Sequence, residues 1–328
     1  MKTILNTLFT SKHLTRTEAK NALIDIATGS VPPAQIASFM TVYLMRKISV
    51  EELAGFRDAL IELVTKVDLS DFLPMDLCGT GGDNKDTFNI STLSSFIVAG
   101  AEIPIAKHGN YAVSSSCGSS NVLEYFGYRF TDSEDELKRH LERSGICFLH
   151  APLFHPALKK VAGVRKELQV KTFFNMLGPL IHPASPEKQL LGVYSMELAD
   201  LYSQLLFETN KDYCIVHSLD GFDEISLTGP YRIIERHSDT IFNPEEEGFK
   251  TIQASEIVGG TSVESSANIF IDILNGNGTT SQNSVVIANA AAAIKCYKPA
   301  LSTFESIEIA KESLDSKKAL LTFKNLIN

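Results

Sequence analysis

The sequence predicts an α/β fold, with a small all-helical N-terminal domain and a larger α/β domain built on a central, largely parallel sheet. Two observations lead to this prediction. The first ~70 residues carry only helix signals, and after Pro74 short apolar segments alternate with helical patterns. Strands that alternate with helices form parallel sheets covered by those helices. A chain of 328 residues is long enough for one large domain or two smaller ones.

The N-terminal helices are marked by their ends. Two pairs have capping-box spacing, which satisfies backbone N–H groups at a helix start: Thr15-x-x-Glu18 and Ser49-x-x-Glu52. Between them, Gly29 can end one helix and Pro32-Pro33 can begin the next. The apolar residues that recur at helical spacing after Pro33 indicate packing between antiparallel helices.

The strands of the second domain are expected at five short apolar segments. These are Met75–Cys78, Pro104–Ala106, Ile146–Leu149, Leu190–Tyr194 and Tyr213–Val216. Helices are expected over Ser133–Ser144, over the alanine-rich Ala288–Ile294, and in a last helix capped by Ser302-x-x-Glu305. We expect the helical domain to span residues 1–72, with part of about 156–188 packing on it, and the α/β domain to span 73–155 and 189–328.

Composition excludes several function classes. The chain has 30 Lys and Arg against 39 Asp and Glu, a net charge of −9, which argues against binding nucleic acid or a membrane surface through bulk charge. The longest apolar runs are far shorter than the ~20 residues of a membrane span, and we expect no membrane association. Five cysteines without a C-x-x-C pair suit reduced thiols, so we expect a cytoplasmic protein.

A glycine loop follows the first strand. Gly79-Thr80-Gly81-Gly82-Asp83 leads towards Asn89-Ile90-Ser91-Thr92, which opens a helix. Glycine lets backbone N–H groups approach a ligand closely, and a helix N-terminus favours an anion, so this is a candidate phosphate site. A tight turn followed by an Asn or Ser N-cap explains the same residues without a ligand, and both interpretations stay open. The loop is neither a Walker motif nor a dinucleotide fingerprint.

Two further clusters carry chemistry. Lys107-His108-Gly109-Asn110 ends a predicted strand, and the serine-rich 114–119 follows it, where α/β sheets place ligands. Ser119 alone could be the N-cap of a helix through Asn121–Phe126. Asp223-Glu224 is either a solvated turn or, beside a phosphate site, a pair of ligands for Mg²⁺.

The motifs taken together resemble those of anthranilate phosphoribosyltransferase over essentially the whole chain. They are GTGGD at 79–83, NIST at 89–92, KHGN at 107–110, SSSCGSSNVLE at 114–124, HPALKKVAGVRKEL at 155–168, FNMLGPL at 174–180 and DGFDEISLTGP at 220–230. The resemblance implies a homodimer with its active site at a hinge between the domains. It also implies the transfer of phosphoribose from 5-phosphoribosyl 1-diphosphate to the amine of anthranilate, with Mg²⁺ as cofactor, in tryptophan biosynthesis.

The resemblance also implies residue roles. The catalytic group would be Lys107, His108, Asp223 and Glu224. The phosphoribosyl-diphosphate site would comprise Gly79, Gly82, Asp83, Thr87, Asn89, Ile90, Ser91, Thr92, Lys107, His108, Gly109, Asn110, Ser115 and Ser119. Anthranilate would meet Gly79, Asn110, His155 and Arg165, the last of which has a planar fork suited to a carboxylate. Ser91, Asp223 and Glu224 would contact the metal.

The chain departs from the usual family pattern at Tyr111, Cys117 and Asn121, where relatives commonly have Arg, Ser and Asp. Two other functions remain open at this point. One is a pyrimidine nucleoside phosphorylase, which shares the fold and a KHGN-like motif. The other is a relative that has lost catalysis and binds nucleic acid, which the net charge of −9 disfavours.

Overall fold

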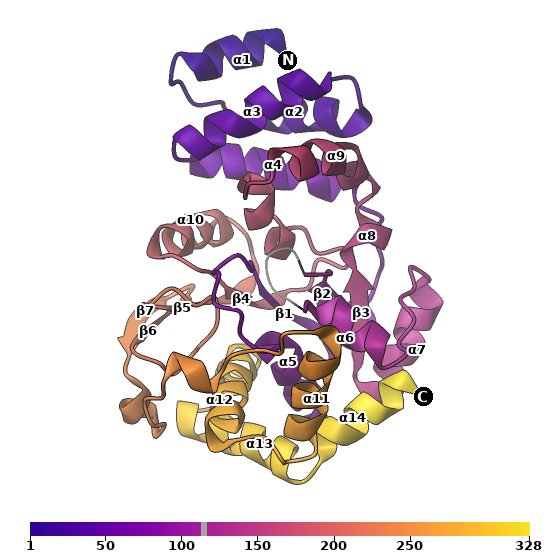
Figure 1. Cartoon of the computed structure of the whole chain (residues 1–328), viewed down its shortest axis with the longest axis vertical. Helices are drawn as coiled ribbons and strands as arrows, with labels where there is room; N and C mark the ends of the chain where they lie inside the picture. Colours follow the sequence, from indigo (N-terminus) through magenta and orange to yellow (C-terminus); the bar gives the residue numbers. More distant parts are fainter. Residues whose placement is uncertain (113–116) are drawn as a thin grey trace. The chain divides into compact units, whose positions relative to one another are not determined.

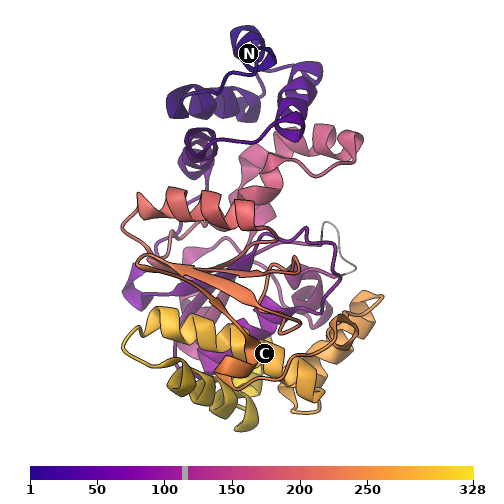
Figure 2. The same cartoon turned by 90° about the vertical axis from the view of Figure 1, so that its left-hand side faces the viewer.

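The computed structural model describes residues 1–112 and 117–328, which divide into two compact units (Figures 1 and 2). The helical unit comprises Met1–Val67 and Ala151–Ser185, and the α/β unit comprises Asp68–His150 and Pro186–Asn328. Each junction between the units lies a few residues before the one expected from the sequence.

The helical unit consists of helices and short 3₁₀ turns, as the sequence predicts for its first part. Its helices are α1 (Lys2–Phe9), α2 (Arg16–Thr28), α3 (Pro33–Met45), α4 (Val50–Leu63), α8 (Ala151–Phe154) and α9 (Lys159–Leu168). The capping boxes at Thr15 and Ser49 are both formed. Gly29 ends α2 in the left-handed conformation with φ 84°, and Pro33 is the first residue of α3.

Aromatic side chains form the centre of this unit. The rings of Phe39, Tyr43, Phe56 and Phe173 meet pairwise, and Phe56 stacks on Phe173 with centroids 4.5 Å apart. Phe173 lies in a 3₁₀ turn (Phe173–Met176) of the second chain segment. The two segments of the unit therefore share one core. Offset aromatic pairs in such a core add about 0.5–1.5 kcal/mol each to the free energy gained from burying apolar area.

The α/β unit contains the central sheet that the sequence predicts. Its strands are β1 (Met75–Gly79), β2 (Ile105–Gly109), β3 (Ile146–His150), β4 (Lys188–Gly192), β5 (Asp212–Ser218), β6 (Tyr231–Glu235) and β7 (Ser238–Phe242). They are ordered β3-β2-β1-β4-β5-β6-β7, and the first five of these are mutually parallel. The predicted fold class is confirmed.

Three details differ from the sequence-based expectation. The antiparallel hairpin β6–β7 was not anticipated, because β7 is almost wholly exposed and shows no apolar alternation. The strand predicted at Leu190–Tyr194 begins two residues earlier, at Lys188. The predicted last helix, α13 (Thr303–Asp315), is followed by α14 (Lys318–Ile327), whose N-cap Lys317 has φ 66° and makes no side-chain cap bond.

Helices cover both faces of the sheet. Figure 2 shows α10 (Met196–Phe207) on one face, and α12 (Thr280–Tyr297), α13 and α14 on the other. The remaining helices of the unit are α5 (Ile90–Gly100), α6 (Ser119–Tyr125), α7 (Glu134–Ser144) and α11 (Val263–Leu274). Every residue of α5 except Ser91 is buried.

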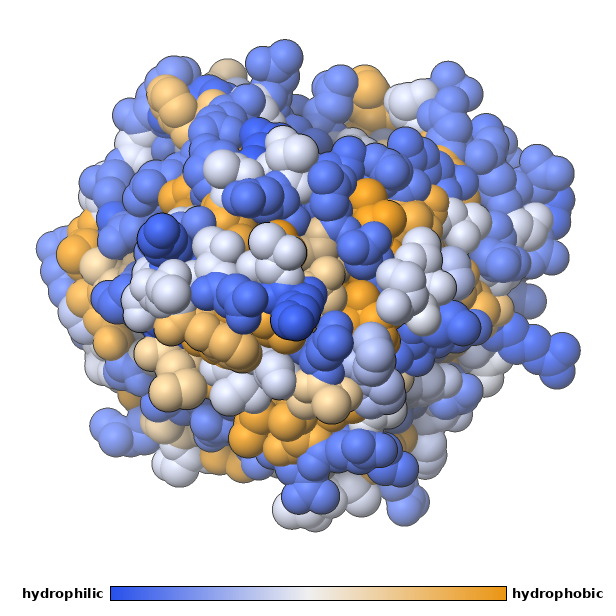
Figure 3. Space-filling model, turned by 90° about the horizontal axis from the view of Figure 1, so that it is seen from above, coloured by the Kyte–Doolittle hydropathy of each residue, from blue (hydrophilic) through white to orange (hydrophobic). Residues whose placement is uncertain are grey.

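The face of the molecule seen in Figure 3 is mixed in character. On the face drawn in Figure 3, hydrophobic residues form small groups among hydrophilic ones. Among residues 1–112 and 117–328, no helix combines the length and the apolar character needed to cross a bilayer.

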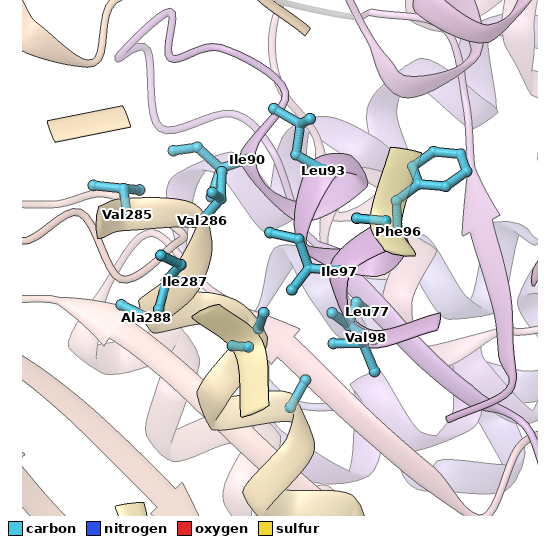
Figure 4. Packing of buried hydrophobic residues seen from close by; sticks show 14 of the residues in the cluster. Leu77, Ile90, Leu93, Phe96, Ile97, Val98, Val285, Val286, Ile287 and Ala288 are labelled. Carbon is cyan, nitrogen blue, oxygen red and sulfur yellow. The ribbon is translucent and has the colours of Figure 1, made fainter. Parts of the chain in front are cut away.

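The main core lies where α5 and α12 pack beside the sheet. In Figure 4, Ile97 and Val98 of α5 lie near Leu77 of β1, with Val286 and Ile287 of α12 on the other side. A helix buried almost all round cannot shift without disturbing its neighbours. The N-terminus of α5 is therefore held firmly at one edge of the sheet.

Candidate active site

The candidate site lies where the parallel strands of the α/β unit end. The chain runs from β1 to β2 and β3 on one side and then returns to β4 on the other side of β1. Such a switch of direction leaves a crevice at the carboxyl ends of the strands, where α/β sheets bind ligands. Gly79 and Gly192, which end β1 and β4, are paired in the sheet at this point.

The loop after β5 brings Asp223 to these two glycines. Gly81 N–H donates a 2.6 Å hydrogen bond to Asp223 Oδ2. A Cβ atom at Gly79 would lie 2.5 Å from Asp223 Oδ2, and one at Gly192 would lie 1.8 Å from the Asp223 carbonyl oxygen. Only glycine fits at either position. Gly192 was not identified from the sequence, because its importance comes from its pairing with Gly79.

Asp223 and Glu224 are buried, with exposures of 7% and 8%. Burial, reinforced by the nearby Asp83 charge, raises the pKa of Asp223 to about 7. Burial and the Asp223 charge raise the pKa of Glu224 well above its usual range, opposed by Lys107 and the Ser91 N–H. The solvated-turn interpretation of these carboxylates is therefore wrong. A cation bound between these two buried acids would favour their ionised forms and lower both pKa values.

Lys107 and Ser91 join this pair. Lys107 is 2% exposed, and its Nζ donates to the Leu77 carbonyl oxygen and, over 3.3 Å, to Ser91 Oγ. The structure thus brings Lys107, Ser91, Asp223 and Glu224 together from separate chain segments. His108 follows Lys107 in β2, and since strand side chains alternate, it points to the opposite face of the sheet.

The start of α5 has no side-chain cap, and two of its N–H groups already have acceptors: Ile90 N–H donates to the Phe88 carbonyl oxygen over 2.7 Å, and Ser91 N–H bonds to Glu224. Asn89 occupies the N-cap position but does not cap the helix; its Nδ2 donates instead to the Cys117 carbonyl oxygen, 3.1 Å away. Asn89 is therefore the N-cap residue that the sequence offered as an alternative, but its side chain makes no cap bond. Gly81 and Gly82 have φ of 63° and 82°, conformations that glycine adopts at no steric cost. The geometry favours the phosphate cradle.

The other residues predicted to bind phosphoribosyl diphosphate lie along the same loop and helix. Asp83 and Thr87 lie between β1 and α5, and Ile90 and Thr92 lie in the first turn of α5, where both are 1% exposed. One oxygen of Asp83, Oδ2, is buried and accepts no hydrogen bond from the described residues.

Polar groups connect the end of β2 with the start of α6. Ser119 is the first residue of α6 rather than its N-cap, which is Gly118, and this corrects the sequence-based alternative. Ser119 Oγ donates to the Asn110 carbonyl oxygen over 3.3 Å, and a Cβ at Gly109 would lie 2.5 Å from Ser119 Oγ. Ser115 lies outside the described residues.

Two of the three atypical residues, Tyr111 and Asn121, have clear contacts. Asn121 Oδ1 accepts hydrogen bonds from the N–H groups of Ala112 and Gly118, both 3.0 Å. Tyr111 OH donates to Glu124 Oε1 over 3.2 Å. An aspartate at 121 could accept the same two bonds, so asparagine here keeps both of them.

His155 and Arg165, predicted to meet anthranilate, belong to the helical unit. Burial, with a smaller effect from His182, lowers the pKa of His155 to about 4, so its ring is neutral at pH 7. Arg165 is half-buried, its guanidinium lies 5.4 Å from the Phe174 ring centroid, and burial lowers its pKa. Among the described residues, no carboxylate forms an ion pair with Arg165.

The donor set of the site fits Mg²⁺. Within the described part of the chain, no group of three or more His, Cys, Asp or Glu residues forms a complete metal cage. Magnesium keeps water and substrate oxygens and usually takes only one or two protein carboxylates. Asp223 and Glu224 supply two, and Ser91 supplies a neutral oxygen beside them.

Comparison with known proteins assigns the family. Residues 2–64 match the helical bundle domain of a glycosyl transferase family, and residues 73–320 match the α/β domain of the same family. The chain is 52% identical to the anthranilate phosphoribosyltransferase of Cytophaga hutchinsonii, with all of both chains covered. It is 53% identical to that of Flavobacterium johnsoniae, over 99% of this chain and 98% of the relative. The chain belongs to the anthranilate phosphoribosyltransferase family.

Solved structures of the anthranilate phosphoribosyltransferase family share this fold. The enzyme from Thermus thermophilus superimposes with a TM-score of 0.91 at 30% identity and 98% coverage of both chains. The Saccharomyces cerevisiae enzyme in complex with PRPP (5-phosphoribosyl 1-diphosphate) and Mg gives 0.90 at 26% identity, covering 98% of this chain and 95% of the yeast chain. The resemblance drawn from the motifs is confirmed over the full length.

Proposed function

We propose that this chain transfers the phosphoribosyl group of 5-phosphoribosyl 1-diphosphate to the amine of anthranilate, giving N-(5-phosphoribosyl)anthranilate and diphosphate. The observation that carries the proposal is the assembly of Lys107, Ser91, Asp223 and Glu224 at the first turn of α5 and the glycine loop that precedes it. This arrangement can bind a substrate with many phosphate charges and a divalent cation, and the family relatives carry the name of this activity.

We assign the diphosphate to the glycine loop and the first turn of α5. Backbone N–H groups of the loop and of the α5 terminus would donate to phosphate oxygens, and Ser91 and Thr92 would add hydroxyls. Asp223 and Glu224, with Ser91, would hold Mg²⁺, which when bound neutralises charge on the diphosphate. Lys107 contributes a fixed positive charge at the centre of this group and offsets the repulsion between the carboxylates and the substrate.

We assign anthranilate to Gly79, Asn110, His155 and Arg165. The half-buried guanidinium of Arg165 can form a bidentate bond to the anthranilate carboxylate, which fixes the orientation of the amine. His155 is neutral at pH 7 and therefore presents an uncharged ring to an aromatic substrate.

The reaction needs positioning more than proton transfer. The bond between C1 of the ribose and the diphosphate oxygen breaks with the electron pair leaving on the diphosphate, and the aromatic amine attacks C1. The new C–N bond leaves the nitrogen positively charged, and it then releases one proton to the diphosphate or to water. An aromatic amine is unprotonated at neutral pH, so a strong general base is not needed before attack. We infer that His108 has no indispensable role as a base and that alignment supplies much of the rate.

We also propose that the enzyme is a homodimer of the cytoplasm. Phe9 of α1 and Leu44 and Met45 of α3 are 62%, 46% and 83% exposed, and exposed large apolar side chains are typical of a subunit interface. All five cysteines are free thiols, which suits a reducing compartment. Light scattering on the purified protein should give twice the mass of 36.0 kDa, and Met45→Glu should shift it towards the monomer.

The activity is tested by anthranilate fluorescence. Purified protein should cause a decay that requires both 5-phosphoribosyl 1-diphosphate and Mg²⁺ and that stops when the metal is chelated. No decay, combined with phosphorolysis of uridine or thymidine, would reassign the chain to nucleoside phosphorylases. If neither activity is detected and the protein binds DNA in a salt-sensitive manner, the chain would instead be a non-catalytic relative.

A further inference from the structure

One buried amide clamps the segment that carries the two carboxylates. Asn289 lies in the middle of α12 and is 1% exposed. Its Oδ1 accepts a 3.0 Å hydrogen bond from Ile225 N–H, and its Nδ2 donates to the Ile225 carbonyl oxygen at 2.9 Å. Nδ2 also donates to the Val285 carbonyl oxygen at 2.9 Å. A single side chain thus satisfies both backbone polar groups of the residue that follows Glu224.

The clamped segment depends on such bonds for its shape. Residues 219–230 form neither helix nor strand, so no regular ladder holds their backbone. A second anchor close to the pair is Ser218 Oγ, which donates to the Glu224 carbonyl oxygen over 2.7 Å. Leu227 has φ 59°, a costly conformation for a residue other than glycine. Removing the amide would leave two buried backbone groups of Ile225 unsatisfied, which favours a different path for the chain.

The position of the carboxylates allows little movement. Asp223 packs so tightly on Gly79 and Gly192 that a single added carbon at either glycine would overlap it. A shift of Ile225 by about one ångström would therefore displace Glu224 and Asp223, the two residues that precede it, and Asp223 has no free space to move into. Since bound metals require well-placed ligands, such a shift would weaken cation binding before it unfolds the protein.

We propose that Asn289 is a positioning residue for the divalent-cation site: through Ile225 it sets where Asp223 and Glu224 present their oxygens. The inference rests on the proposed function, because that function places the cation between these carboxylates and the diphosphate. Asparagine is a poorer helix former than the alanines around it, so helix propensity does not explain this residue. The residue was not visible as functional in the sequence, where it stands in an alanine-rich run 64 positions from its partner.

The test compares Asn289→Ala and Asn289→Asp with Ser313→Ala. Asp can still accept from Ile225 N–H but cannot donate when ionised, so it removes half of the clamp. Ser313 is the matched control: it is 1% exposed, and its Oγ donates over 2.6 Å to the Ile97 carbonyl oxygen, away from the carboxylate segment. Each protein is titrated with Mn²⁺ in the presence of inorganic diphosphate, with free Mn²⁺ followed by electron paramagnetic resonance. Thermal unfolding is measured in parallel.

We expect Asn289→Ala to weaken Mn²⁺ binding by about 10–100-fold and Asn289→Asp to weaken it less. In steady-state assays the KM for Mg²⁺ should rise similarly, while the KM for anthranilate stays within about 2-fold. Ser313→Ala should lower the melting temperature and leave Mn²⁺ affinity unchanged.

The proposal would be overturned if both Asn289 variants fold and bind Mn²⁺ as tightly as the wild type. If Asn289→Ala does not fold, wild-type Mn²⁺ affinity in Asn289→Asp would overturn it. The absence of Mn²⁺ binding by the wild type would overturn it too. A third outcome separates the two proposals: the wild type binds Mn²⁺, Asn289→Ala does not, and neither protein consumes anthranilate. That result would support the positioning role of Asn289 and refute the proposed substrate.

Discussion

Glu52 of the helical unit should be one of the most sensitive single positions for stability. Its side chain is fully buried, yet it is ionised and surrounded by donors. Arg46 contributes the closest pair, with Nη2 2.5 Å from Oε1 and Nη1 3.0 Å from Oε2. The remaining groups within hydrogen-bond distance are the backbone N–H of Leu14 and of Ser49, the hydroxyls of Tyr43 and Ser49, and His13 Nδ1.

The magnitude follows from the pKa. Burial alone would raise the pKa of Glu52, but the hydrogen bonds from Arg46, His13 and backbone N–H groups overcome it and lower the pKa from 4.5 to about 2. A shift of that size corresponds to about 3 kcal/mol of folding free energy at pH 7. Glu52→Gln keeps the shape but loses the charge and turns an NH₂ group towards other donors. We expect it to lower the free energy of unfolding by about 3–4 kcal/mol.

The pH dependence provides the discriminating assay. Because the folded-state pKa is depressed, this stabilisation is complete above the unfolded-state pKa and is lost as pH falls towards 2. The difference between wild type and Glu52→Gln should therefore shrink to about 1–2 kcal/mol at pH 3. Urea unfolding followed by circular dichroism at pH 7 and pH 3 measures it. Glu51→Gln, an exposed neighbour in the same first turn of α4, is the control and should change stability by only about 0.5 kcal/mol. A loss under about 1 kcal/mol at pH 7, or a difference independent of pH, would refute the reasoning.

Three predictions concern the proposed reaction. His108→Ala should reduce kcat by about 10-fold or less, whereas alanine at both Asp223 and Glu224 should remove measurable turnover. The reason is that electrostatic stabilisation contributes more to this reaction than base catalysis. Equal and complete losses of turnover in the two variants would contradict this prediction. Gly192→Ala should reduce kcat/KM by more than about 100-fold, because the added Cβ would lie 1.8 Å from the Asp223 carbonyl oxygen. A near-normal rate would show that the carboxylate segment can move freely. Arg165→Lys should raise the KM for anthranilate by about 10-fold and leave the KM for 5-phosphoribosyl 1-diphosphate unchanged, because lysine lacks the bidentate fork. Parallel changes in both KM values would show that Arg165 does not bind anthranilate specifically.

Much of the fold could be read from local signals. The capping boxes at Thr15 and Ser49, the left-handed glycine after α2 and the proline start of α3 all act within a few residues of chain, so the sequence alone determines them. The alternation of strands and helices after Pro74 predicts the parallel sheet for the same reason. Where local signals are weak, as in the exposed strand β7 or the uncapped start of α14, the elements were missed.

The site divides in the same way. The order of residue types along the chain was sufficient to nominate Lys107, Ser91, Asp223 and Glu224 and to match a family. Only the tertiary structure decided that the two carboxylates are buried, because desolvation depends on what distant segments pack against them. It also decided that Gly192 and Asn289 contact the carboxylate segment, since close packing and long-range hydrogen bonds join residues that no pattern in the sequence connects.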